Sequence, residues 1–460
     1  MSLNATHEAV VIGAGVSGLA LAHDLHRAGL EALVLEKGSE PGGCARTHSE
    51  SGFLFERGPF NLLVRNPLFE SLLGDLNDRV EVVPPSPSAK RREILLGGMR
   101  RKVPMSLPDA LATPLLSPAQ KLRALAEPLL GHRPTSADPT LGDLIRRRFG
   151  NGIADRVVSA VVAGVFGGDL DQLSARSCFP LLWEVDQSSS SLILGLIRKG
   201  FQSRKNPRRK WKGMISFRDG VGGFCRAMAS VLGERLHLNT GVESIERIEG
   251  GYRVHVRSSH GESGEIRTAR LILGTDLPAA RGLLSPWARP VAELLEPIES
   301  VSLAVVNAGF GPEAFPTAPE GFGFLVPKVE KGVSILGALF ASSVFPHQAP
   351  EGCHSIRIFI GGTRSPGWVR FGDEELVERA LAELARFLPI KAKPRALAVS
   401  KWPDSVPQMK PGHFERIAEV EGLLEREYPG LHLVGNYLHG VSVNDCVVHA
   451  RTTAARLLAG

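Results

Sequence analysis

The first forty residues alternate between apolar runs and a small, glycine-rich turn. An apolar run at 9–12 enters the turn GAGVSG at 13–18, an amphipathic stretch continues to Ala28, and a second apolar run ends at Glu36. This order of patterns predicts a strand, a tight turn, a helix and a second strand. We therefore expect the chain to open with a βαβ unit.

The glycines of this turn have the spacing of a dinucleotide-binding fingerprint. Gly13 permits the tight turn, Gly15 lets the backbone approach a pyrophosphate, and Gly18 lets helix and strand pack closely. The helix N-terminus offers N–H groups to the phosphates, and Glu36 is placed to accept hydrogen bonds from ribose hydroxyls. The candidate contacts of this unit are Gly13, Gly15, Ser17, Gly18, Glu36 and Lys37.

A second glycine motif, GGCAR at 42–46, follows the acid. It resembles the extended FAD motif of amine-oxidase-like flavoproteins, which NAD-dependent dehydrogenases generally lack. Its glycines let a loop lie against the diphosphate, and Arg46 offers a planar fork of donors to phosphate or flavin oxygens. We predict FAD, with Gly42, Gly43, Ala45 and Arg46 as further contacts; the alternative is an ordinary glycine turn with a solvated arginine.

Helical and strand-like patterns alternate along the rest of the chain. Short strands are expected at 93–96 and 101–104, and helices at 118–198. Further strands are expected at 215–217, 236–238, 242–249, 252–258 and 270–274, with a turn at 219–223 and a helix at 224–232. A β-rich block at 298–310, 321–327 and 333–346 precedes a helix near 374–387, and the chain ends in a strand, a glycine loop and a helix.

These segments predict an α/β fold, α+β overall. It combines a Rossmann-like FAD-binding domain of the p-hydroxybenzoate hydroxylase/amine oxidase type with a β-rich substrate domain and a helical insertion. The FAD-binding domain is expected to be discontinuous, from residues 1–80, 213–280 and 400–460. The substrate domain takes 81–105 and 281–399, and a helical domain, a candidate for membrane association, takes 106–212.

Length and composition limit the chemistry. The 460 residues exceed one compact core, so two or three domains are expected. Five cysteines without a CxxC pair argue against disulfides and fit a reducing cytoplasm. The fourteen histidines show no HxH or HExxH spacing, so we predict no metal. No run of eighteen apolar residues and no signal-peptide pattern are present, which favours a cytoplasmic protein.

The net charge of +6 arises mainly before residue 213. Its clusters lie at 91–92, 100–102, 146–148 and 198–212. They are either solvated faces or a source of attraction to an anionic partner, such as a membrane surface or a carboxylate-rich substrate. The apolar-to-basic segment 191–213 is either an interfacial helix or a core helix followed by a surface loop. Nucleic acid is not expected, because aromatic residues do not interleave with the basic clusters.

Six local stretches, in order along nearly the whole chain, resemble the bacterial-type protoporphyrinogen oxidase family. They are GVFGGDLDQLSARSCFPLLWE at 164–184, SSLILGLI at 190–197, DGVGGF at 219–224, SVSLAVVN at 300–307, GFGFLVP at 321–327 and VGNYLHGVSVNDCV at 434–447. The family includes a coproporphyrinogen-oxidising branch, and it is often dimeric.

The resemblance implies an FAD-dependent oxidation of protoporphyrinogen IX to protoporphyrin IX in haem biosynthesis. Successive hydrides pass from the methylene bridges to flavin N5, and molecular oxygen is the usual acceptor. The bound flavin supplies the difficult chemistry, which fits a sequence without a triad or a carboxylate dyad. The alternatives are coproporphyrinogen III oxidation, an amine oxidase or desaturase of the same fold, and a tetrapyrrole-binding paralogue without turnover.

The resemblance also assigns candidate substrate contacts. Arg92 matches an arginine that pairs with a ring propionate, with the adjacent Arg91 as an alternative. Leu325 and Phe340 match apolar residues that sandwich the macrocycle, the alternative being ordinary core residues. Gly164 matches a glycine whose carbonyl lies near the pyrroles.

Further FAD contacts are implied at Val242 and in the C-terminal loop. The loop positions are Gly435, Asn436, Gly440, Val441, Ser442 and Val443, where a helix N-terminus is expected to face the flavin. Two features depart from the family pattern or stand out: Phe60-Asn61-Leu62 replaces residues that are more often polar, and the loop at 200–212 is unusually basic. His439 is either a base near the flavin or a solvated loop residue.

Overall fold

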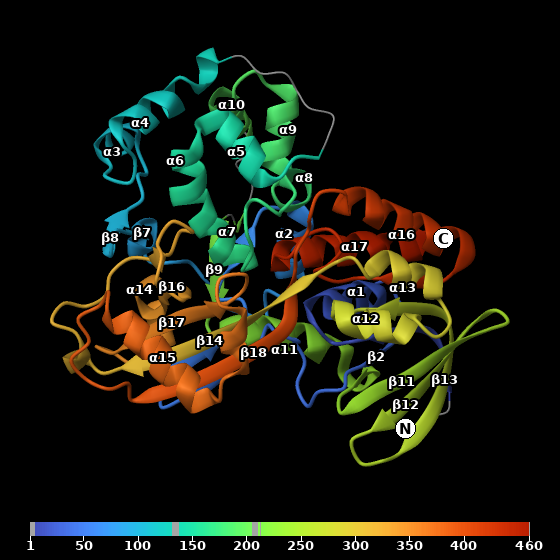
Figure 1. Ribbon diagram of the computed structural model, residues 1–460. Helices are drawn as coiled ribbons and strands as arrows, with labels where there is room; N and C mark the ends of the chain where they lie inside the picture. The colour runs from blue at the N-terminus through green and yellow to red at the C-terminus, as the bar shows by residue number, and fades with distance from the viewer. Residues whose placement is uncertain (1–4, 131–137, 205–209, 212, 460) are drawn as a thin grey trace.

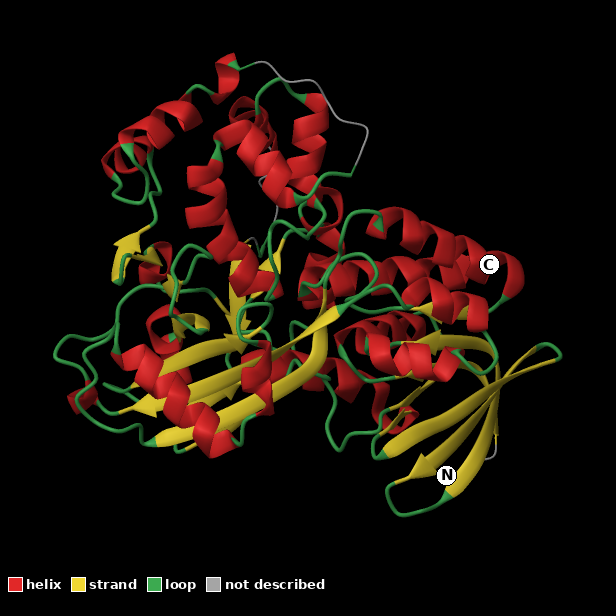
Figure 2. Cartoon of the chain, in the orientation of Figure 1, coloured by secondary structure: helices red, strands yellow, loops and turns green. Residues whose placement is uncertain are grey.

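The computed structural model describes residues 5–130, 138–204, 210–211 and 213–459, and these form three regions. Figure 1 shows a group of helices from the middle of the chain at the top. A sheet covered by α15 (Asp373–Ala385) lies below it on the left, and a second sheet with its helices lies on the right. The secondary structure of the same view is shown in Figure 2.

The sheet on the right contains the predicted βαβ unit. Its strand order is β10-β2-β1-β13-β12-β11, and β19 also pairs with β13. β1 runs parallel to β2 and β13, with α1 (Val16–Arg27) as the crossover from β1 to β2. The strand bounds are β1 Ala5–Ile12, β2 Ala32–Leu35, β10 Leu236–His237, β11 Thr240–Ile248, β12 Gly251–Ser258, β13 Ser263–Leu273 and β19 Leu431–Leu433.

Helices cover both faces of this sheet, which makes it a buried layer as expected for a mainly parallel sheet. One apolar cluster joins it to α1, α11 (Gly220–Leu232) and α17 (Val443–Ala459). Another joins it to α12 (Leu277–Leu284), α13 (Arg289–Leu295) and α16 (His413–Glu427). The sequence patterns did not predict α12, α13 or α16, and α11 begins at Gly220, inside the expected turn.

The left-hand sheet has the order β18-β14-β17-β16-β15-β7-β8. Its strands are β7 Arg92–Leu96, β8 Met99–Lys102, β14 Ser300–Phe310, β15 Gly323–Leu325, β16 Ile335–Phe340, β17 His354–Gly361 and β18 Ala396–Pro407. The sequence patterns missed β17 and β18. Because β18 pairs with β14 through Pro407, residues 400–407 belong to this sheet and not to the nucleotide side, where the expected boundary at 400 had put them.

The two faces of the left-hand sheet differ. The outer face carries an apolar cluster, including Phe324, Ala338, Phe340, Ile356 and Ile358, packed against α15. Residues paired directly across neighbouring strands point to the same side. The inner face therefore includes Arg92, Ile94, Leu303, Val305, Asn307, Leu325, Leu339, Arg357, Phe359 and Trp402.

Short strands connect the two sheets. β4 (Phe53–Glu56) forms a hairpin with β3 (Thr47–Glu50), while β9 (Gly213–Phe217) pairs with β5 (Leu62–Val64) and β6 (Val82–Val83). α2 (Pro67–Asp75) follows β5. The backbone carbonyls of Glu56, Arg57 and Gly58 accept hydrogen bonds from inner-face side chains, which are Asn307, Trp402 and Arg357 respectively. Segment 56–58 is thus tied to the inner face.

The helical region consists of α3 Leu107–Ala112, α4 Pro118–Leu125, α5 Leu141–Phe149, α6 Asn151–Ile153, α7 Ser159–Phe166, α8 Ala175–Cys178, α9 Pro180–Ser188 and α10 Leu192–Arg204. Leucines and phenylalanines of α5, α7 and α9–α10 form its core. α3 and α4 bury no residue at all. Among the described residues, no helix is both long enough and apolar enough to cross a membrane.

Candidate functional site

The turn between β1 and α1 is so tight that only glycine fits at positions 13 and 18. Gly13 has a φ of +100°, and a Cβ at this position would lie 2.6 Å from the carbonyl oxygen of Gly274. A Cβ on Gly18 would lie 2.0 Å from the carbonyl oxygen of Gly13. The α1 N-cap, Gly15, makes no side-chain cap hydrogen bond, so no side chain of the cap occupies the N-terminus that the fingerprint offers to phosphate.

The second glycine motif lies directly on the first. The Gly42 N–H donates to the Ala14 carbonyl over 2.7 Å, and a Cβ on Gly43 would be 3.3 Å from the Gly15 Cα. Positive φ values of +113° and +60° at Gly42 and Gly43 make this loop possible. The structure therefore brings together the two motifs that the sequence singled out separately.

The charged residues of this region already have backbone partners. Glu36 is 8% exposed, and its carboxylate accepts hydrogen bonds of 2.8 Å from the Ala14 and Gly38 N–H groups. Arg46 donates from Nη2 to the Glu40 carbonyl, whereas its buried Nε has no partner. Ser17 and Ala45 are buried, and Lys37 lies beside Gly241, the neighbour of Val242 in β11. Val242 borders a bulge of that strand.

The C-terminal loop, 434–443, leads into α17. Ser442 caps this helix, since its Oγ accepts from the Asp445 N–H and donates to the Asp445 carboxylate. A Cβ on Gly440 would meet Asp445 at 2.6 Å, and one on Gly435 would meet the Tyr437 ring at 2.6 Å. Asn436 donates to the Ser405 carbonyl of β18. Val441 packs on the helical region and Val443 on the nucleotide-side core.

The helices that follow the glycine turn and the C-terminal loop, α1 and α17, are paired. Arg451 of α17 forms a 2.7 Å ion pair with Asp24 of α1, so the two helices that begin at the glycine turn and at the C-terminal loop lie side by side. We call the glycine turn, the 42–46 loop and Glu36 the glycine cradle. Its backbone-only turns, its helix N-terminus without a side-chain cap and its acid fit the diphosphate and ribose of FAD.

The inner face brings two of the predicted substrate contacts together. A Cβ on Gly164 of α7 would lie 2.7 Å from Leu325 Cδ2, so the leucine packs in the space that the glycine leaves. A Cβ on Gly167, the residue that ends α7, would likewise lie 3.0 Å from Cδ2 of Leu303, which belongs to the same face. The helical region thus closes over the inner face through α7, as Figure 1 shows.

Phe340 does not join them. It is 1% exposed and lies on the outer face, where its ring is 6.5 Å from the Phe324 ring. Its neighbour Leu339 points to the inner face, next to Phe60. Leu325 and Phe340 therefore lie on opposite faces of the sheet, which does not fit the predicted sandwich of one macrocycle between them. A one-residue shift in a strand reverses the face.

Arg92 begins β7 at the edge of the inner face and is exposed. Its guanidinium lies 5.4 Å from the Phe322 ring centroid, and no described carboxylate is paired with it. Arg91 is different, because its Nε and Nη2 both donate to Glu93. Of the two arginines that the sequence offered, Arg92 is the one free to bind an anion.

Sequence patterns missed two buried ionisable residues, Arg357 and Glu56, which form no ion pair with each other. Arg357 is 1% exposed, and burial lowers its pKa to about 10, so it is charged at neutral pH. Burial raises the pKa of Glu56 to about 7, although its carboxylate accepts hydrogen bonds from the Thr47 hydroxyl and the Val221 N–H. The sequence did offer one sign of these residues, since Arg357 and Glu56 are each a charged residue in an otherwise largely apolar strand, HSIRIFIG at 354–361 and FLFE at 53–56.

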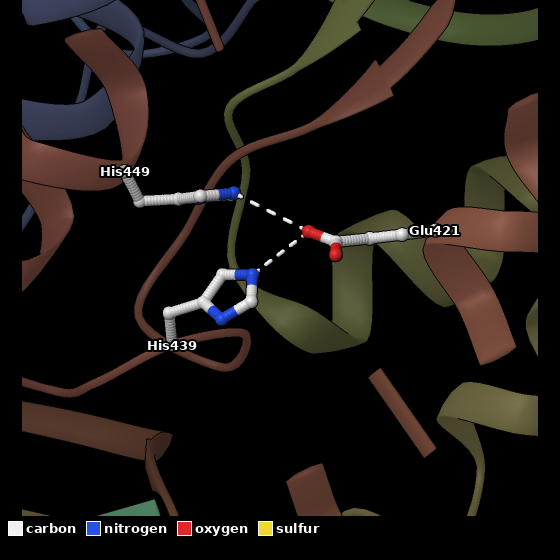
Figure 3. A group of neighbouring side chains, drawn as sticks. All are labelled: Glu421, His439 and His449. Carbon is white, nitrogen blue, oxygen red and sulfur yellow. Dashed lines mark hydrogen bonds and ion pairs between the residues drawn. The ribbon is translucent and has the colours of Figure 1, made fainter. Parts of the chain in front are cut away.

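A further polar group lies beside the C-terminal loop (Figure 3). His439 Nε2 is 2.8 Å and His449 Nε2 3.7 Å from Glu421 Oε1, and both imidazoles keep the pKa of this carboxyl far below its usual range. The three ligand-type atoms lie within 4.8 Å of one another. Spacing in the sequence does not show such a group, because its members come from α16, the loop and α17. His439 is turned toward Glu421, as Figure 3 shows.

The fold and the glycine cradle are those of a flavin-dependent oxidoreductase. The model of the flavin containing amine oxidoreductases matches residues 16–458, and the chain belongs to this family. This confirms the predicted fold class and FAD as the cofactor.

Named relatives within this family include porphyrinogen oxidases. Protoporphyrinogen oxidase 1, chloroplastic, from Arabidopsis thaliana is 30% identical, over 98% of this chain and 87% of its own length. Coproporphyrinogen III oxidase from Bacillus subtilis is 27% identical, over 98% of this chain and 97% of its own length. A crystal structure from Exiguobacterium sp. 255-15 that carries a protoporphyrinogen oxidase name superposes with a TM-score of 0.81 at 25% identity, covering 100% of this chain and 99% of the other.

Proposed function

We propose that the protein uses bound FAD to oxidise a porphyrinogen to the corresponding porphyrin, with molecular oxygen as the final acceptor. The observation that carries the proposal is the inner face, where Leu325 and Gly164 meet beside a free arginine, Arg92. An apolar surface with a cation at its edge suits a flat macrocycle that bears carboxylates. The names of the relatives support the same substrate class.

The chain's own residues mainly bind and orient in this proposal. Arg92 holds a propionate, while Leu325 and Leu339 contact the apolar ring. Gly164 brings the α7 backbone close to it. The flavin, when bound, accepts the hydrides. For the complete oxidation, six electrons and six hydrogens leave the macrocycle, and three O₂ molecules are reduced to three hydrogen peroxide molecules.

Two substrates remain candidates for this site. Protoporphyrinogen IX carries two propionates and two vinyl groups, whereas coproporphyrinogen III carries four propionates. Both contain the same methylene bridges, so the same oxidation applies to each. Arg92 alone serves either substrate, because it needs only one carboxylate.

Aerobic incubation of the FAD-loaded protein with each porphyrinogen tests the proposal. Porphyrin fluorescence is expected to rise faster than it does by spontaneous oxidation without the protein. Three molecules of hydrogen peroxide should form for each molecule of porphyrin. Arg92→Ala is expected to raise KM about tenfold, since a charge-assisted hydrogen bond is lost. Rates equal to the spontaneous oxidation with both substrates would refute the function, and an unchanged KM would refute the role of Arg92.

We also propose that α3 and α4 contact a membrane surface. Leu107 of α3, Leu122 of α4 and Leu129 of the 3₁₀ turn that follows (Glu127–Leu129) are 64%, 70% and 87% exposed, and α3 and α4 bury none of their residues. Lys121 and Arg123 of α4 can contact anionic headgroups from the same helix. The basic segment predicted for this role, 198–212, is described only in part, since residues 205–209 and 212 lie outside the described residues.

Sedimentation with anionic vesicles tests this contact. Replacement of the three leucines by serine is expected to reduce the bound fraction severalfold. The matched control replaces Val329 and Leu397, which are isolated exposed apolar residues elsewhere, and should bind like the wild type. Equal binding of both variants would contradict the proposal.

A further inference from the structure

Arg357 and Arg92 occupy one row of the inner face. The directly paired residues across four strands are Arg357 in β17, Leu339 in β16, Gly323 in β15 and Arg92 in β7. Three strand spacings of about 4.8 Å separate the two arginines, which is about 14 Å. Only a leucine and a glycine lie between them in this row. The apolar floor of the proposed site therefore has an arginine at each end.

Arg357 is poorly partnered for a buried cation. Its Nη2 donates to the Gly58 carbonyl over 2.8 Å, but Nε and Nη1 are buried without any partner. The ring centroids of Phe60 and Phe359 each lie 5.4 Å from the guanidinium carbon. Aromatic faces attract a cation, yet they do not replace missing hydrogen-bond acceptors.

A second buried arginine shows what a structural role demands in the same chain. Arg148 is 4% exposed, and it donates to the carboxylates of Glu127 and Asp186. It also donates to the carbonyls of Ser190, Asp186 and Ser189, so its three nitrogens are all bonded. Buried charges normally have such partners. The chain therefore supplies no acceptor for two of the three guanidinium nitrogens of Arg357.

We propose that Arg357 binds a second carboxylate of the macrocycle and thereby makes coproporphyrinogen III the preferred substrate. This inference rests on the proposed function. A substrate with propionates on all four rings places carboxylates at opposite edges, one toward Arg92 and another toward Arg357. Protoporphyrinogen IX has its two propionates on neighbouring rings at one edge. With Arg92 engaged, it presents a vinyl group to Arg357 and leaves the buried cation unpaired.

The same residue also ties segment 56–58 to the sheet through Gly58, and this tether acts on both substrates equally. A discriminating experiment must therefore compare substrates within one variant. We choose Arg357→Met, which keeps much of the apolar side-chain volume but removes the charge, and Arg357→Lys, which restores the charge without the planar fork. Arg92→Met is the matched control at the other end of the row.

The ratio of kcat/KM for coproporphyrinogen III to that for protoporphyrinogen IX is the measured quantity. Arg357→Met is expected to lower it about tenfold or more, the usual effect of losing a charge-assisted hydrogen bond. Arg357→Lys should recover part of the ratio, and Arg92→Met should lower both rate constants with a smaller change in their ratio. Flavin absorbance and the thermal midpoint verify that each variant is folded and loaded. A ratio unchanged in Arg357→Met would overturn the proposal.

Binding to the unaltered protein provides a test that needs no variant to fold. Fluorescence titration of the FAD-loaded wild type should give a Kd for coproporphyrin III at least about tenfold below that for protoporphyrin IX. Equal affinities would also overturn the role of Arg357. If coproporphyrin III binds more tightly but neither porphyrinogen is oxidised, the proposed function fails while the carboxylate site stands.

Discussion

The glycine cradle and the inner face, the proposed sites of FAD and of the porphyrinogen, are built in different ways. In the cradle, the atoms that define the site are backbone atoms, such as the Gly13 carbonyl 2.0 Å from where a Gly18 Cβ would be. On the inner face they are side chains from strands far apart in sequence, such as Arg92 and Arg357. A site made of backbone needs glycines at fixed spacing, whereas a site made of paired strands needs only the right register.

This difference sets how each region responds to a small change. A backbone obstruction cannot move without moving the turn, while a side chain has other rotamers. The substitutions below test the contrast, beginning with the largest expected effect.

Gly18→Ala is expected to weaken FAD binding strongly. The new Cβ would overlap the Gly13 carbonyl, so the turn between β1 and α1 must open. Overpacking of this kind costs about 1–3 kcal/mol or more, and we expect FAD affinity to fall at least about tenfold. The flavin content of the purified protein and titration of the apoprotein with FAD measure this loss.

Gly74→Ala serves as the control for that experiment. Gly74 lies in α2, and a Cβ there would meet nothing within 4 Å. Alanine also favours a helix over glycine by about 1 kcal/mol. The control should retain FAD and unfold at the same or a higher temperature. Normal FAD affinity in Gly18→Ala would show that the turn is less rigid than its contacts indicate.

Phe340→Ala and Leu339→Ala separate the two faces of the left-hand sheet. Phe340 is buried among the residues packed on α15, so its truncation should lower the free energy of unfolding by about 3–5 kcal/mol. Its effect on porphyrin affinity should be small. Leu339→Ala should instead weaken porphyrin binding, with a smaller loss of stability. Urea unfolding and fluorescence titration test the pair, and a reversed pattern would restore Phe340 to the substrate site.

The case of Phe340 illustrates how far sequence carries the prediction of this protein. Leu325 and Phe340 were both predicted to contact the macrocycle, yet the apolar pair Leu339-Phe340 offers no choice of face until the pairing of β16 with β15 is known. The βαβ unit and the C-terminal loop were predictable, because glycine spacing reports local backbone geometry. β17 and β18 were missed, and Arg357 with them, because the pairing of both strands with β14 joins residues more than forty positions apart, which local patterns do not report.

Glu56→Gln tests the buried charges below the inner face. The folded pKa of about 7 lies above the ordinary value of 4.5, so the native state binds more protons than the unfolded state between these pH values. The stabilising contribution of the neutral carboxyl is complete below pH 4.5 and is lost as the pH rises through 7. The loss amounts to about 3 kcal/mol.

Glu56→Gln replaces the titrating carboxyl by an amide that does not titrate. Relative to the wild type, it should therefore gain stability by about 3 kcal/mol between pH 5 and pH 8, as measured by urea unfolding at each pH. Glu50→Gln, on the exposed face of the same hairpin, is the control and should show no such gain. A parallel pH dependence in wild type and Glu56→Gln would mean that Glu56 is ionised throughout.

Gly164→Ala should have the smallest effect, although it is the same chemical change as Gly18→Ala. The obstructing atom is Leu325 Cδ2 at 2.7 Å, the end of a side chain that can rotate away, and α7 gains an alanine in its interior. We expect stability to stay within about 1 kcal/mol of the wild type and the KM for porphyrinogen to rise about threefold, since the displaced leucine then occupies part of the inner face. FAD content should not change. A loss of FAD comparable to that of Gly18→Ala would remove the distinction, because it would mean that side-chain packing on the inner face is as unyielding as the backbone of the cradle.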